Sequence, residues 1–437
     1  MNWSSQYIYF LLFIIVLSIV LTISLNNSNC DNINNNALVF KREKQFKTHL
    51  KIHNNEKKIK QNANSLAIPS KIATYFSKGR YAYPAQVNNT NKPVICIISL
   101  GGSYKTSDLQ TYWTSSGYTS ASFVAPTFHA VDGVTTAPNQ SFGSSSGSFY
   151  GASMENTLDL EIAMTLCPTA QIHFFSGPNS LLGFLHTIQA AKTYLVSLPN
   201  TKCKIISISW GMDELYYDPI TILSYNATFA DAQSNGISVC AASGDNSADD
   251  GSGILSVDFP ASSPYVISCG GTSYNSGSTE TAWSYNSTYG WGGGGGYSMF
   301  FDKPSYQNVK VTSASSVGLI GSALLTNRSV PDIAMNADPL YGWAVYFNGA
   351  YATVGGTSCV SPAFAAFLGL CNKPSSAYNA STNVLTKLYT APTGCFNDIA
   401  SGTNNSLGLS NLYTARAGYD QCTGLGSIIG TTLISNL

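Results

Sequence analysis

The sequence predicts an α/β fold whose central sheet is mostly parallel and flanked by helices. Continuous apolar runs of strand length alternate with helical patterns at 153–165 and 181–191. Such runs are typical of parallel strands buried on both faces, and the active site of such a sheet gathers beyond the carboxyl ends of its strands. The predicted strands are Val94–Leu100, Gln171–Phe175, Lys204–Trp210, Ile237–Ala242 and Val266–Cys269.

The helix predicted at 153–165 carries two carboxylates on one face. Glu155 and Asp159 are four residues apart, so they lie one helical turn from each other. If the pair is partly buried, it can share one proton, as a general base and its orienting partner require. If the pair is exposed, the two acids simply mark a solvated helix start.

The strand predicted at 237–242 runs directly into Ser-Gly-Asp245. Asp245 can fix a turn through its side chain, which is a common use of aspartate. It can equally face the crevice at the strand ends. The local sequence leaves both interpretations open.

The stretch Thr353–Phe367 predicts a strand, a tight turn and a helix. β-branched residues lead into Gly355-Gly356, and an Ala- and Phe-rich run follows, with Pro362 in the first turn, where its missing N–H costs little. Ser358 therefore lies at a helix N-terminus, where free N–H groups favour a developing negative charge. Ser358 is either a nucleophile or a helix cap.

Charge is sparse and unevenly distributed along the 437 residues. Only 10% of the residues are charged, so the surface must be covered mainly by neutral polar groups. Residues 1–65 hold eight of the 22 Lys and Arg residues but three of the 22 Asp and Glu residues, which leaves a mildly acidic body. Nothing in this balance indicates a nucleic-acid partner.

We expect three parts in the chain. Tyr7–Leu25 is an uncharged apolar run, so 1–25 is either a signal peptide or a signal anchor. Residues 26–65 form an Asn- and Lys-rich linker or a short pro-segment, whose basic stretch is either a solvated linker or an amphipathic helix. The folded body is expected at 66–437.

The chain is expected to enter the secretory pathway. Ten cysteines permit disulfides in an oxidising compartment, and the pair we expect is Cys395 with Cys422. Eight Asn-X-Ser/Thr sequons are compatible with an exported glycoprotein. They lie at Asn26, Asn88, Asn139, Asn226, Asn286, Asn327, Asn379 and Asn404.

Taken together, the motifs resemble the sedolisin family of serine-carboxyl peptidases, relatives of subtilisin that use Glu and Asp where subtilisin uses His and Asp. The resemblance covers about 370 residues from Leu66 onward, and the motifs occur in the order of the family. They are Ser99–Tyr104, Glu155-x-x-x-Asp159, Ser207–Gly211, Ala242–Asp245, Phe259–Val266, Cys269–Thr272, Gly292–Gly296, Arg328–Ala334, Gly355–Pro362 and Asp420–Gly426.

The resemblance implies a subtilisin-like three-layer fold and peptide hydrolysis through an acyl-enzyme. It implies that Ser358 is the nucleophile, Glu155 its general base and later general acid, Asp159 the residue that orients Glu155, and Asp245 the side-chain donor of the oxyanion hole. Because an aspartate donates a hydrogen bond to an oxyanion only when protonated, the enzyme should act at acid pH. No histidine lies in a suitable motif for a base, and we interpret His129, His173 and His186 as structural or surface residues.

The resemblance also implies one structural Ca²⁺ near the C-terminus. Its ligands are implied to be the side chains of Asp398 and Asp420 with the carbonyls of Ile399, Arg416 and Gly418, and hard oxygen ligands of this kind suit calcium. The alternative is a Gly/Asp turn tied by Cys422.

The chain departs from the family pattern at three points. Ser99 stands where many relatives have Glu, so the carboxylate network is shortened and the pH optimum shifted. Cys359 follows Ser358 and is expected to be buried. The family usually carries a long prodomain, whereas about forty residues separate the apolar run from the expected body, so the chain either folds without one or is inhibited differently.

These observations predict an exported, calcium-stabilised, monomeric peptidase that acts on peptides and proteins as an endopeptidase or as a tripeptidyl-peptidase. Its expected location is extracellular or the lumen of a lysosome or other acidic vesicle. Two alternatives stay open. One is a catalytically silent secreted binding glycoprotein of the same fold, and the other is a glycoprotein held in the membrane by residues 7–25.

Overall fold

The computed structural model describes one folded unit, Gln45–Leu437, and the second unit, Met1–Lys44, lies outside the described residues. The predicted signal segment therefore lies outside them as well. Within the described part of the chain, no helix is both long and apolar enough to span a membrane. The described residues are 45–52, 80–85, 91–135, 137–145, 147–274, 279–285, 290–311, 324–405 and 413–437.

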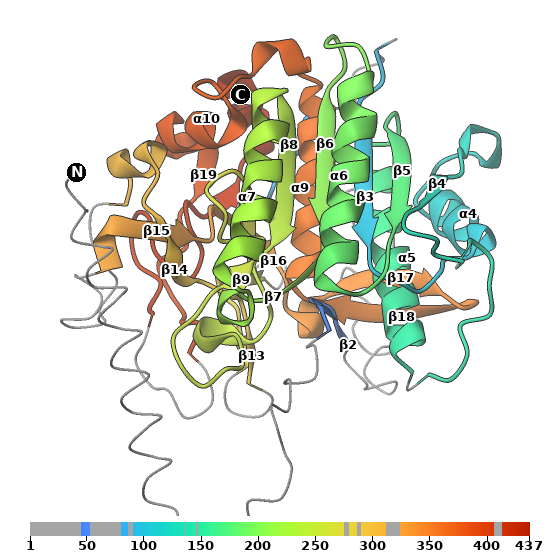
Figure 1. Ribbon diagram of the computed structural model, residues 1–437, viewed down its shortest axis with the longest axis horizontal. Coiled ribbons are helices and arrows are strands. Elements are labelled where there is room, and N and C mark those ends of the chain that lie inside the picture. The colour runs from blue at the N-terminus through green and yellow to red at the C-terminus, as the bar shows by residue number, and fades with distance from the viewer. Residues whose placement is uncertain are drawn as a thin grey trace, which may run out of the picture. The chain divides into compact units, whose positions relative to one another are not determined.

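An eight-stranded, mostly parallel sheet forms the centre of this unit (Figure 1). Seven strands follow the order β11-β10-β8-β6-β3-β5-β4, and β16 pairs in parallel with β10. All five predicted strands belong to this sheet, so the predicted fold class is confirmed. The strands are β3 (Val94–Ser99), β4 (Thr127–Ala130), β5 (Gln171–Ser176), β6 (Lys204–Ile208), β8 (Ile237–Ala242), β10 (Ile267–Ser273), β11 (Thr281–Ala282) and β16 (Ile333–Asn336).

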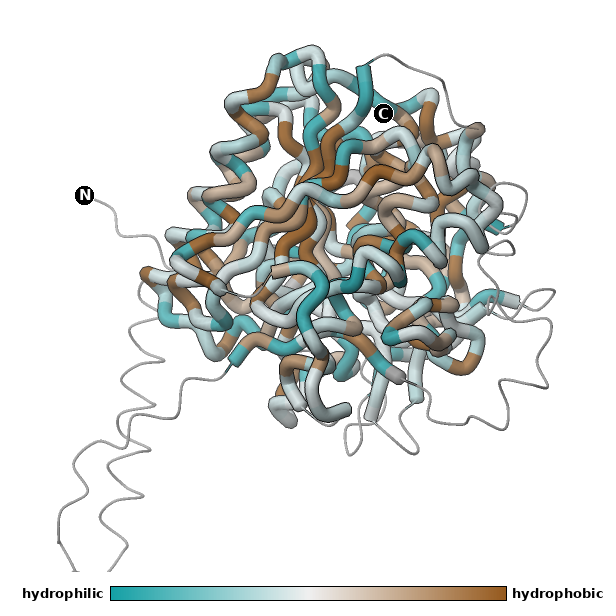
Figure 2. Tube along the Cα trace, turned by 90° about the vertical axis from the view of Figure 1, so that its right-hand side faces the viewer, coloured by the Kyte–Doolittle hydropathy of each residue, from teal (hydrophilic) through white to brown (hydrophobic). Residues whose placement is uncertain are grey.

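Helices cover both faces of the sheet. Helices α6 (Leu181–Ser197) and α7 (Pro219–Ser234) pack on one face, and α5 (Ser148–Leu166) and α9 (Val360–Cys371) pack on the other (Figure 1). Alternate side chains of each strand enter opposite cores, because a strand has a period of two. Figure 2 shows the hydrophobic segments running through the middle of the unit.

Smaller elements surround this three-layer body. The hairpin β17–β18 extends from the end of α9 that carries the predicted nucleophile. The other α-helices among the described residues are α4 (Thr106–Ser115), α10 (Val384–Thr390) and α11 (Gly430–Leu433). The remaining strands are β1 (Lys47–Thr48), β2 (Lys51–Ile52), β7 (Trp210–Asp213), β9 (Asp258–Phe259), β12 (Ser284–Tyr285), β13 (Trp291–Gly292), β14 (Gly296–Asp302), β15 (Asn327–Val330), β17 (Trp343–Phe347), β18 (Ala350–Gly355), β19 (Phe396–Asn397) and β20 (Ser427–Ile428).

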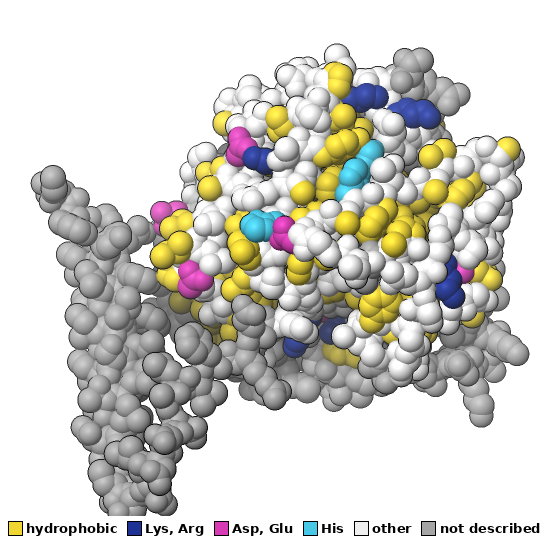
Figure 3. All heavy atoms as spheres, turned by 45° about the vertical axis from the view of Figure 1, so that its right-hand side comes forward, with side chains coloured by type: hydrophobic (Ala, Val, Ile, Leu, Met, Phe, Trp, Pro, Cys, Tyr) yellow, Lys and Arg dark blue, Asp and Glu magenta, His cyan; other side chains and the backbone are white. Residues whose placement is uncertain are grey.

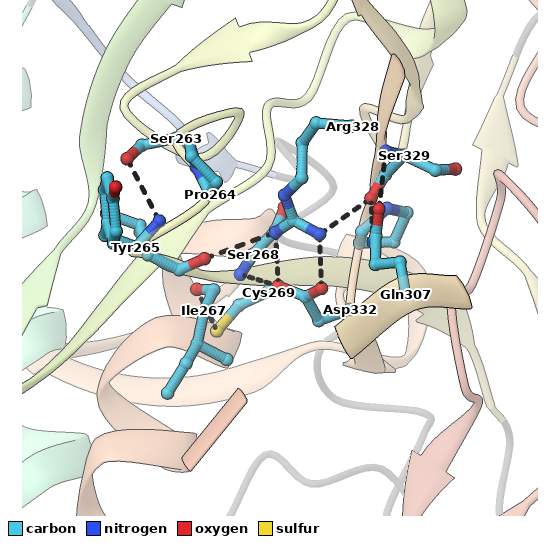
Figure 4. A network of polar contacts seen from close by, with 12 residues as sticks. Ser263, Pro264, Tyr265, Ile267, Ser268, Cys269, Gln307, Arg328, Ser329 and Asp332 are labelled. Carbon is cyan, nitrogen blue, oxygen red and sulfur yellow. Dashed lines mark hydrogen bonds and ion pairs between the residues drawn. The ribbon is translucent and has the colours of Figure 1, made fainter. Parts of the chain in front are cut away.

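A fully buried ion pair joins β15 to the start of β16. The guanidinium of Arg328 donates two parallel hydrogen bonds of 2.6 Å to the carboxylate of Asp332, as Figure 4 shows. The carboxylate also accepts hydrogen bonds from the N–H of Ser268 and the hydroxyl of Tyr389. A buried carboxylate needs such partners, since an unpaired buried charge is strongly destabilising. The pair therefore ties the sheet edge to the C-terminal part of the unit.

The surface is covered largely by neutral polar groups. On the face in Figure 3, charged side chains are few and lie scattered among neutral and hydrophobic ones. This distribution agrees with a chain in which 10% of the residues are charged.

The folded unit begins earlier than the sequence predicted. Residues 45–52 form the short strands β1 and β2, and the side chains of Phe46 and His49 are buried. The interpretation of this stretch as an amphipathic helix or a solvated linker is therefore wrong. The predicted start near Leu66 is therefore too late in the chain, because residues 45–52 pair with strands of the body.

The expected disulfide between Cys395 and Cys422 is also wrong. Both thiols are free, and so are the other described cysteines. Cys395 packs in the large core around α9, whereas Cys422 belongs to a separate small cluster. The Cys422 thiol donates instead to Oδ1 of Asn404.

Candidate active site

The predicted site residues gather at the carboxyl ends of the central strands. Glu155 and Asp159 come from α5, Asp245 follows β8, and Ser358 lies in a 3₁₀ turn, Thr357–Cys359, that leads into α9. All four side chains are at most 1% exposed. Sequence positions two hundred residues apart therefore meet in one buried polar group.

Ser358 is held by a turn that requires glycine. Gly356 has φ +110°, and a Cβ there would lie 2.0 Å from the carbonyl oxygen of His49. The hydroxyl of Ser358 caps no helix and accepts or donates no aligned hydrogen bond among the described residues. The helix-cap interpretation is therefore wrong. Cys359, the next residue, is buried as predicted and its thiol is free.

Glu155 and Asp159 form a buried carboxylate pair. Burial raises the pKa of Glu155 well above its usual range, and the nearby carboxylates of Asp159 and Asp245 raise it further. The hydroxyl of Ser358 lies close enough to lower this pKa in part, although no aligned hydrogen bond joins the two groups. Burial likewise raises the pKa of Asp159. The pair therefore retains a proton at pH values where exposed carboxyls are ionised, and the alternative of a solvated helix start is wrong.

Ser209 connects this pair to the turn of Ser358. It lies between β6 and β7, and its hydroxyl is 2.8 Å from Oδ1 of Asp159 and 3.4 Å from the carbonyl oxygen of Ser358. Since a hydroxyl has one proton, the shorter contact is the better hydrogen bond. Ser209 thus fixes the orientation of Asp159.

Asp245 fixes the turn before Ser358, which is one of the two roles that the sequence left open. Its Oδ1 accepts hydrogen bonds from the N–H (2.7 Å) and the hydroxyl (2.8 Å) of Thr357, which fixes the turn. Its Oδ2 is buried and has no hydrogen-bond partner among the described residues. Burial raises the pKa of Asp245, so a proton on Oδ2 persists above the usual range of an aspartate.

Ser99, at the end of β3, and Asn156, on α5, form a neutral pair. The hydroxyl of Ser99 donates to Oδ1 of Asn156 (2.6 Å), and the amide of Asn156 donates to the carbonyl of Gly101 (2.9 Å). This neutral pair occupies the place where the resemblance implied a further carboxylate. A neutral pair of this kind adds no further charge to the carboxylate pair of Glu155 and Asp159.

Three site residues went unrecognised in the sequence. Ser209, Thr357 and His49 touch the predicted group, yet none of them was named as a site residue. Ser209 lies in the quoted motif Ser207–Gly211, so its position after a buried strand was the available signal. No local signal pointed to His49, because its role depends on where a distant segment folds.

The three interpreted histidines lie apart from Ser358. His129 and His173 contact each other through ring nitrogens 2.9 Å apart, and Tyr194 contacts His173. His186 lies 2.6 Å from Asp132 at the surface. The interpretation of these three as structural or surface residues is therefore confirmed.

The residues implied for calcium lie around one turn. Asp398 accepts hydrogen bonds from the N–H of Gly418 through both oxygens, and Oδ2 of Asp420 accepts one from the N–H of Arg416. Ile399 is buried beside Asp398. Burial raises the pKa of Asp420 to about 6, and no described basic side chain forms an ion pair with it. Two carboxylates therefore meet at one turn, where they accept hydrogen bonds from its N–H groups, and carboxylate oxygens are ligands that suit a calcium ion.

The described residues contain no group of three or more His, Cys, Asp or Glu side chains that could hold a metal. A calcium site in this turn would therefore depend on two carboxylates and on carbonyl oxygens. Cys422 does not tie the turn, since its thiol is free.

The glycosylation candidates differ in exposure. Asn139 and Asn379 are exposed, Asn226 and Asn327 are half-buried, and Asn88 and Asn286 lie outside the described residues. Asn404 is fully buried, and its amide points toward the carbonyls of Gly295 and Gln421. Asn404 is therefore a wrong candidate, because its nitrogen cannot carry a glycan in the folded protein.

The parallel sheet with helices on both faces, and the serine and carboxylates at its strand ends, define a subtilisin-like protein with a serine-carboxyl site. The family model described as the Subtilase family matches residues 151–390, more than half of the chain, and the chain therefore belongs to that family. The predicted resemblance to the sedolisins is confirmed by its relatives.

Kumamolisin from a Bacillus species is 37% identical over 367 residues, a match that covers 82% of this chain and 62% of kumamolisin. Sedolisin from a Pseudomonas species is 30% identical, with 79% of this chain and 57% of sedolisin covered. Tripeptidyl-peptidase 1 from Homo sapiens is 31% identical over 51% of this chain and 39% of that protein. The chain thus spans less than two thirds of the length of these curated relatives.

A solved structure supports the same assignment. Pseudomonas sedolisin, a serine-carboxyl proteinase complexed with two molecules of pseudo-iodotyrostatin, superposes with a TM-score of 0.63 at 25% identity. The match covers 84% of this chain and 96% of the sedolisin chain.

Proposed function

We propose that this protein is an acid-acting serine-carboxyl peptidase that cleaves peptide bonds through an acyl-enzyme on Ser358. One observation carries the proposal: Ser358, Glu155, Asp159 and Asp245 gather in one buried group, and the hydroxyl of Ser358 lies beside a carboxylate that can hold its proton. A buried serine without that partner would remain a weak nucleophile.

In the proposed mechanism Glu155 takes the proton of Ser358 as the hydroxyl attacks the substrate carbonyl. Asp159 orients Glu155 and shares the pair's proton, and Ser209 holds Asp159 in place. Glu155 then delivers its proton to the leaving amine, and a water molecule hydrolyses the ester on Ser358.

The proposed oxyanion hole consists of the N–H of Ser358 and the protonated Oδ2 of Asp245. Two features support it. Oδ2 has no hydrogen-bond partner among the described residues, and a Cβ at Gly356 would lie only 2.5 Å from it, so a side chain at position 356 would block Oδ2. Preorganised donors of this kind stabilise the charge that develops on the carbonyl oxygen.

We further propose that one structural calcium ion is bound by Asp398 and Asp420 with the carbonyls of Ile399, Arg416 and Gly418. When bound, the ion would hold the C-terminal turn in place. The proposed location is extracellular or an acidic vesicle lumen, and peptides or proteins are the proposed substrates.

The mechanism is tested by hydrolysis of a denatured protein and of a free-N-terminus peptide series across acid to neutral pH. We expect activity at acid pH, with Ser358→Ala and Glu155→Gln each losing at least about 10³-fold in kcat, because either change removes the nucleophile–base pair. The masses of the products distinguish internal cuts from the release of tripeptides. Circular dichroism spectra like the parent's are the control for folding.

Full activity in either variant contradicts the mechanism. A folded parent protein without activity at any pH favours the second candidate, a binding glycoprotein of the same fold. The burial of Ser358 beneath residues 45–52 is the observation that favours that candidate.

A further inference from the structure

A surface groove lies between the end of α7, the loop after Pro264, the end of β14 and helix α10. Its volume is about 620 Å³, which is in the range of roughly 300–1,000 Å³ that is typical of ligand sites. None of the residues that line it belongs to the candidate active site. The groove is therefore a separate feature that the proposed mechanism does not use.

The lining of the groove suits an uncharged ligand. The rings of Tyr265, Phe301 and Tyr306 supply its apolar surface, and serine and threonine hydroxyls lie among them. Among the described residues only Asp302 and Lys303 bring charge to the lining, and these two charges have opposite signs. A sugar, which has both C–H faces and hydroxyl groups, matches this mixture of aromatic rings and neutral polar groups.

Gln233 is a nearly buried amide that lacks a partner. It lines the groove, and 8% of the residue is exposed. Neither its side-chain oxygen nor its NH₂ group makes a hydrogen bond to any of the described residues. Since buried polar groups are normally paired, this amide needs a ligand that can both donate and accept, as a sugar hydroxyl or acetamido group can.

The aromatic wall of the groove is held in place from behind. The hydroxyl of Tyr306 donates to the carbonyl of Pro264 (2.8 Å), and the guanidinium carbon of Arg328 lies 5.8 Å from the centre of the Tyr306 ring. Figure 4 shows Pro264 and Tyr265 beside the buried network of Arg328. A wall that is already ordered favours binding, because little conformational freedom is lost when a ligand arrives.

A glycosylation sequon borders the groove. Ala380 and Ser381, the second and third residues of the sequon that begins at Asn379, both line it. Asn379 is exposed, and its Oδ1 accepts hydrogen bonds from the N–H and the hydroxyl of Ser381 (both 2.8 Å). Its Oδ1 also accepts one from the N–H of Thr382 (3.0 Å). These bonds fix the side chain and leave Nδ2, the atom to which a glycan is attached, without a partner among the described residues.

Other described sequons lack this combination. Asn327 is half-buried, and its Nδ2 donates to the carbonyl of Ser298 (2.8 Å). Asn226 is half-buried within α7. Asn139 is exposed, but no residue of its sequon lines the groove. Asn139 is therefore the matched control for an exposed sequon without a groove.

We propose that Asn379 carries an N-linked glycan and that the first sugars of this glycan lie in the groove, where they pair with Gln233. The glycan is attached at the rim, so its binding is intramolecular and needs little affinity for free sugar. The bound glycan covers the aromatic wall and joins the end of α7 to α10. The proposal is independent of the proposed peptidase function.

The attachment needs a sugar donor, which is a lipid-linked oligosaccharide diphosphate of the secretory pathway. A bond forms between Nδ2 of Asn379 and C1 of the first sugar, and Nδ2 loses one proton. The bond between C1 and the phosphate oxygen breaks, and its electron pair stays with the lipid diphosphate that leaves.

The test uses the full chain secreted from a eukaryotic host, with its glycopeptides mapped by mass spectrometry. An endoglycosidase is then added to the folded and to the denatured protein, and release is followed at each occupied sequon. We expect Asn379 to be occupied. Its glycan should leave the folded protein at least about ten-fold more slowly than the denatured protein, because the endoglycosidase acts only on molecules whose glycan has left the groove. At Asn139 the two rates should be nearly equal.

The role of Gln233 is tested by Gln233→Met, which removes the donor and the acceptor while the volume changes little. Release at Asn379 from this folded variant should approach the rate at Asn139. Gln110→Met, a change of an exposed glutamine on α4, is the control and should leave the protection unchanged. Circular dichroism spectra like the parent's show that both variants fold, and the comparison of folded with denatured parent needs no variant.

A secreted chain with Asn379 unoccupied overturns the inference. Equal release at Asn379 from the folded and the denatured parent overturns it as well, since the glycan then lies outside the groove. Protection that persists in Gln233→Met overturns the pairing with Gln233. The proposed peptidase function stands or falls separately, through hydrolysis by the site around Ser358.

Discussion

At the residue scale, the candidate site depends on carboxyl groups that are protonated when exposed carboxyls are not. Burial raises the pKa of Glu155, Asp159 and Asp245, and each group has a different neighbour that uses this effect. Glu155 faces the serine, Asp159 faces Ser209, and Asp245 faces Thr357. One physical cause thus supplies the protonation states that the proposed mechanism needs.

Asp245 gives a sharp prediction at this scale. The N–H of Thr357 needs an acceptor, so an asparagine at 245 should turn its oxygen toward Thr357 and its amide toward the oxyanion. Asp245→Asn should then retain activity at acid pH. It should also keep its N–H donor at higher pH, where the parent loses the donor because Asp245 ionises. Asp245→Ala should lose about 10²–10³-fold in kcat at every pH. Equal losses in the two variants at acid pH would show that Asp245 donates no hydrogen bond. The pH profile of kcat is the measurement.

At the element scale, buried polar groups join separate elements of the chain. The Arg328–Asp332 pair joins β15 to the start of β16 (Figure 4). Asp398 and Asp420 accept hydrogen bonds from the main chain at 416–418 near the C-terminus. Both are candidates for stabilising the fold without touching the chemistry.

Arg328→Met should destabilise the protein by about 3–5 kcal/mol, because it leaves the carboxylate of Asp332 buried without its cation. The double variant Arg328→Met with Asp332→Leu should regain much of that loss. Urea unfolding of the three proteins measures the effect. A single variant as stable as the parent, or a double variant no better than the single one, would contradict this account of the pair.

Removal of calcium should lower the melting temperature of the parent. If the concentration of free calcium is a hundred times its dissociation constant, its removal lowers the free energy of unfolding by about 2.7 kcal/mol. Asp398→Asn and Asp420→Asn should each lower the melting temperature and remove its sensitivity to chelator. Asp231→Asn, a change at an exposed carboxylate paired with Lys192, is the control. Identical melting curves of the parent with and without chelator would count against the site.

At the scale of the whole molecule, buried carboxyls make stability depend on pH. Glu214 is fully buried and accepts hydrogen bonds from Ser298 and the N–H of Met299, and burial raises its pKa to about 7. The folded state therefore holds a proton that the unfolded chain releases near pH 4. The stabilisation is complete below that pH and is lost as pH rises toward 7. An acidic compartment would suit such a protein.

Glu214→Gln should flatten this dependence. Glutamine can accept the N–H of Met299 through its amide oxygen, and its NH₂ group replaces the protonated carboxyl oxygen beside Ser298 without ionising. About 3 kcal/mol of the stability lost between pH 4 and 7 should therefore be retained. Denaturant unfolding at a series of pH values measures the slope, with Asp231→Asn as the exposed control. An unchanged slope in Glu214→Gln would show that other groups cause it.

The order of elements along the chain follows from local sequence. The apolar runs became β3, β5, β6, β8 and β10 because a strand buried on both faces needs a continuous apolar stretch. The turn at Gly355-Gly356 placed Ser358 before α9 because a close main-chain approach excludes a side chain there. The spacing of Glu155 and Asp159 placed both on one helix face.

Tertiary structure alone decided what those residues face. Whether Glu155 and Asp159 share a proton depends on their burial, and helical spacing cannot report burial. The sequence likewise does not show that Asn404 is buried or that the thiols of Cys395 and Cys422 are free.

The segment at 45–52 shows the limit most clearly. Its alternation of lysines with Phe46 and His49 predicts a solvated basic stretch. In the structure, Phe46 is buried against Phe184 and His49 against Asp258, and both partners are far away in the sequence. Local sequence therefore determined the sheet, the nucleophile turn and the carboxylate pair, because these depend on short-range periodicity. Tertiary structure decided protonation, thiol pairing and the occupant of the site, because these depend on contacts between residues far apart in the chain.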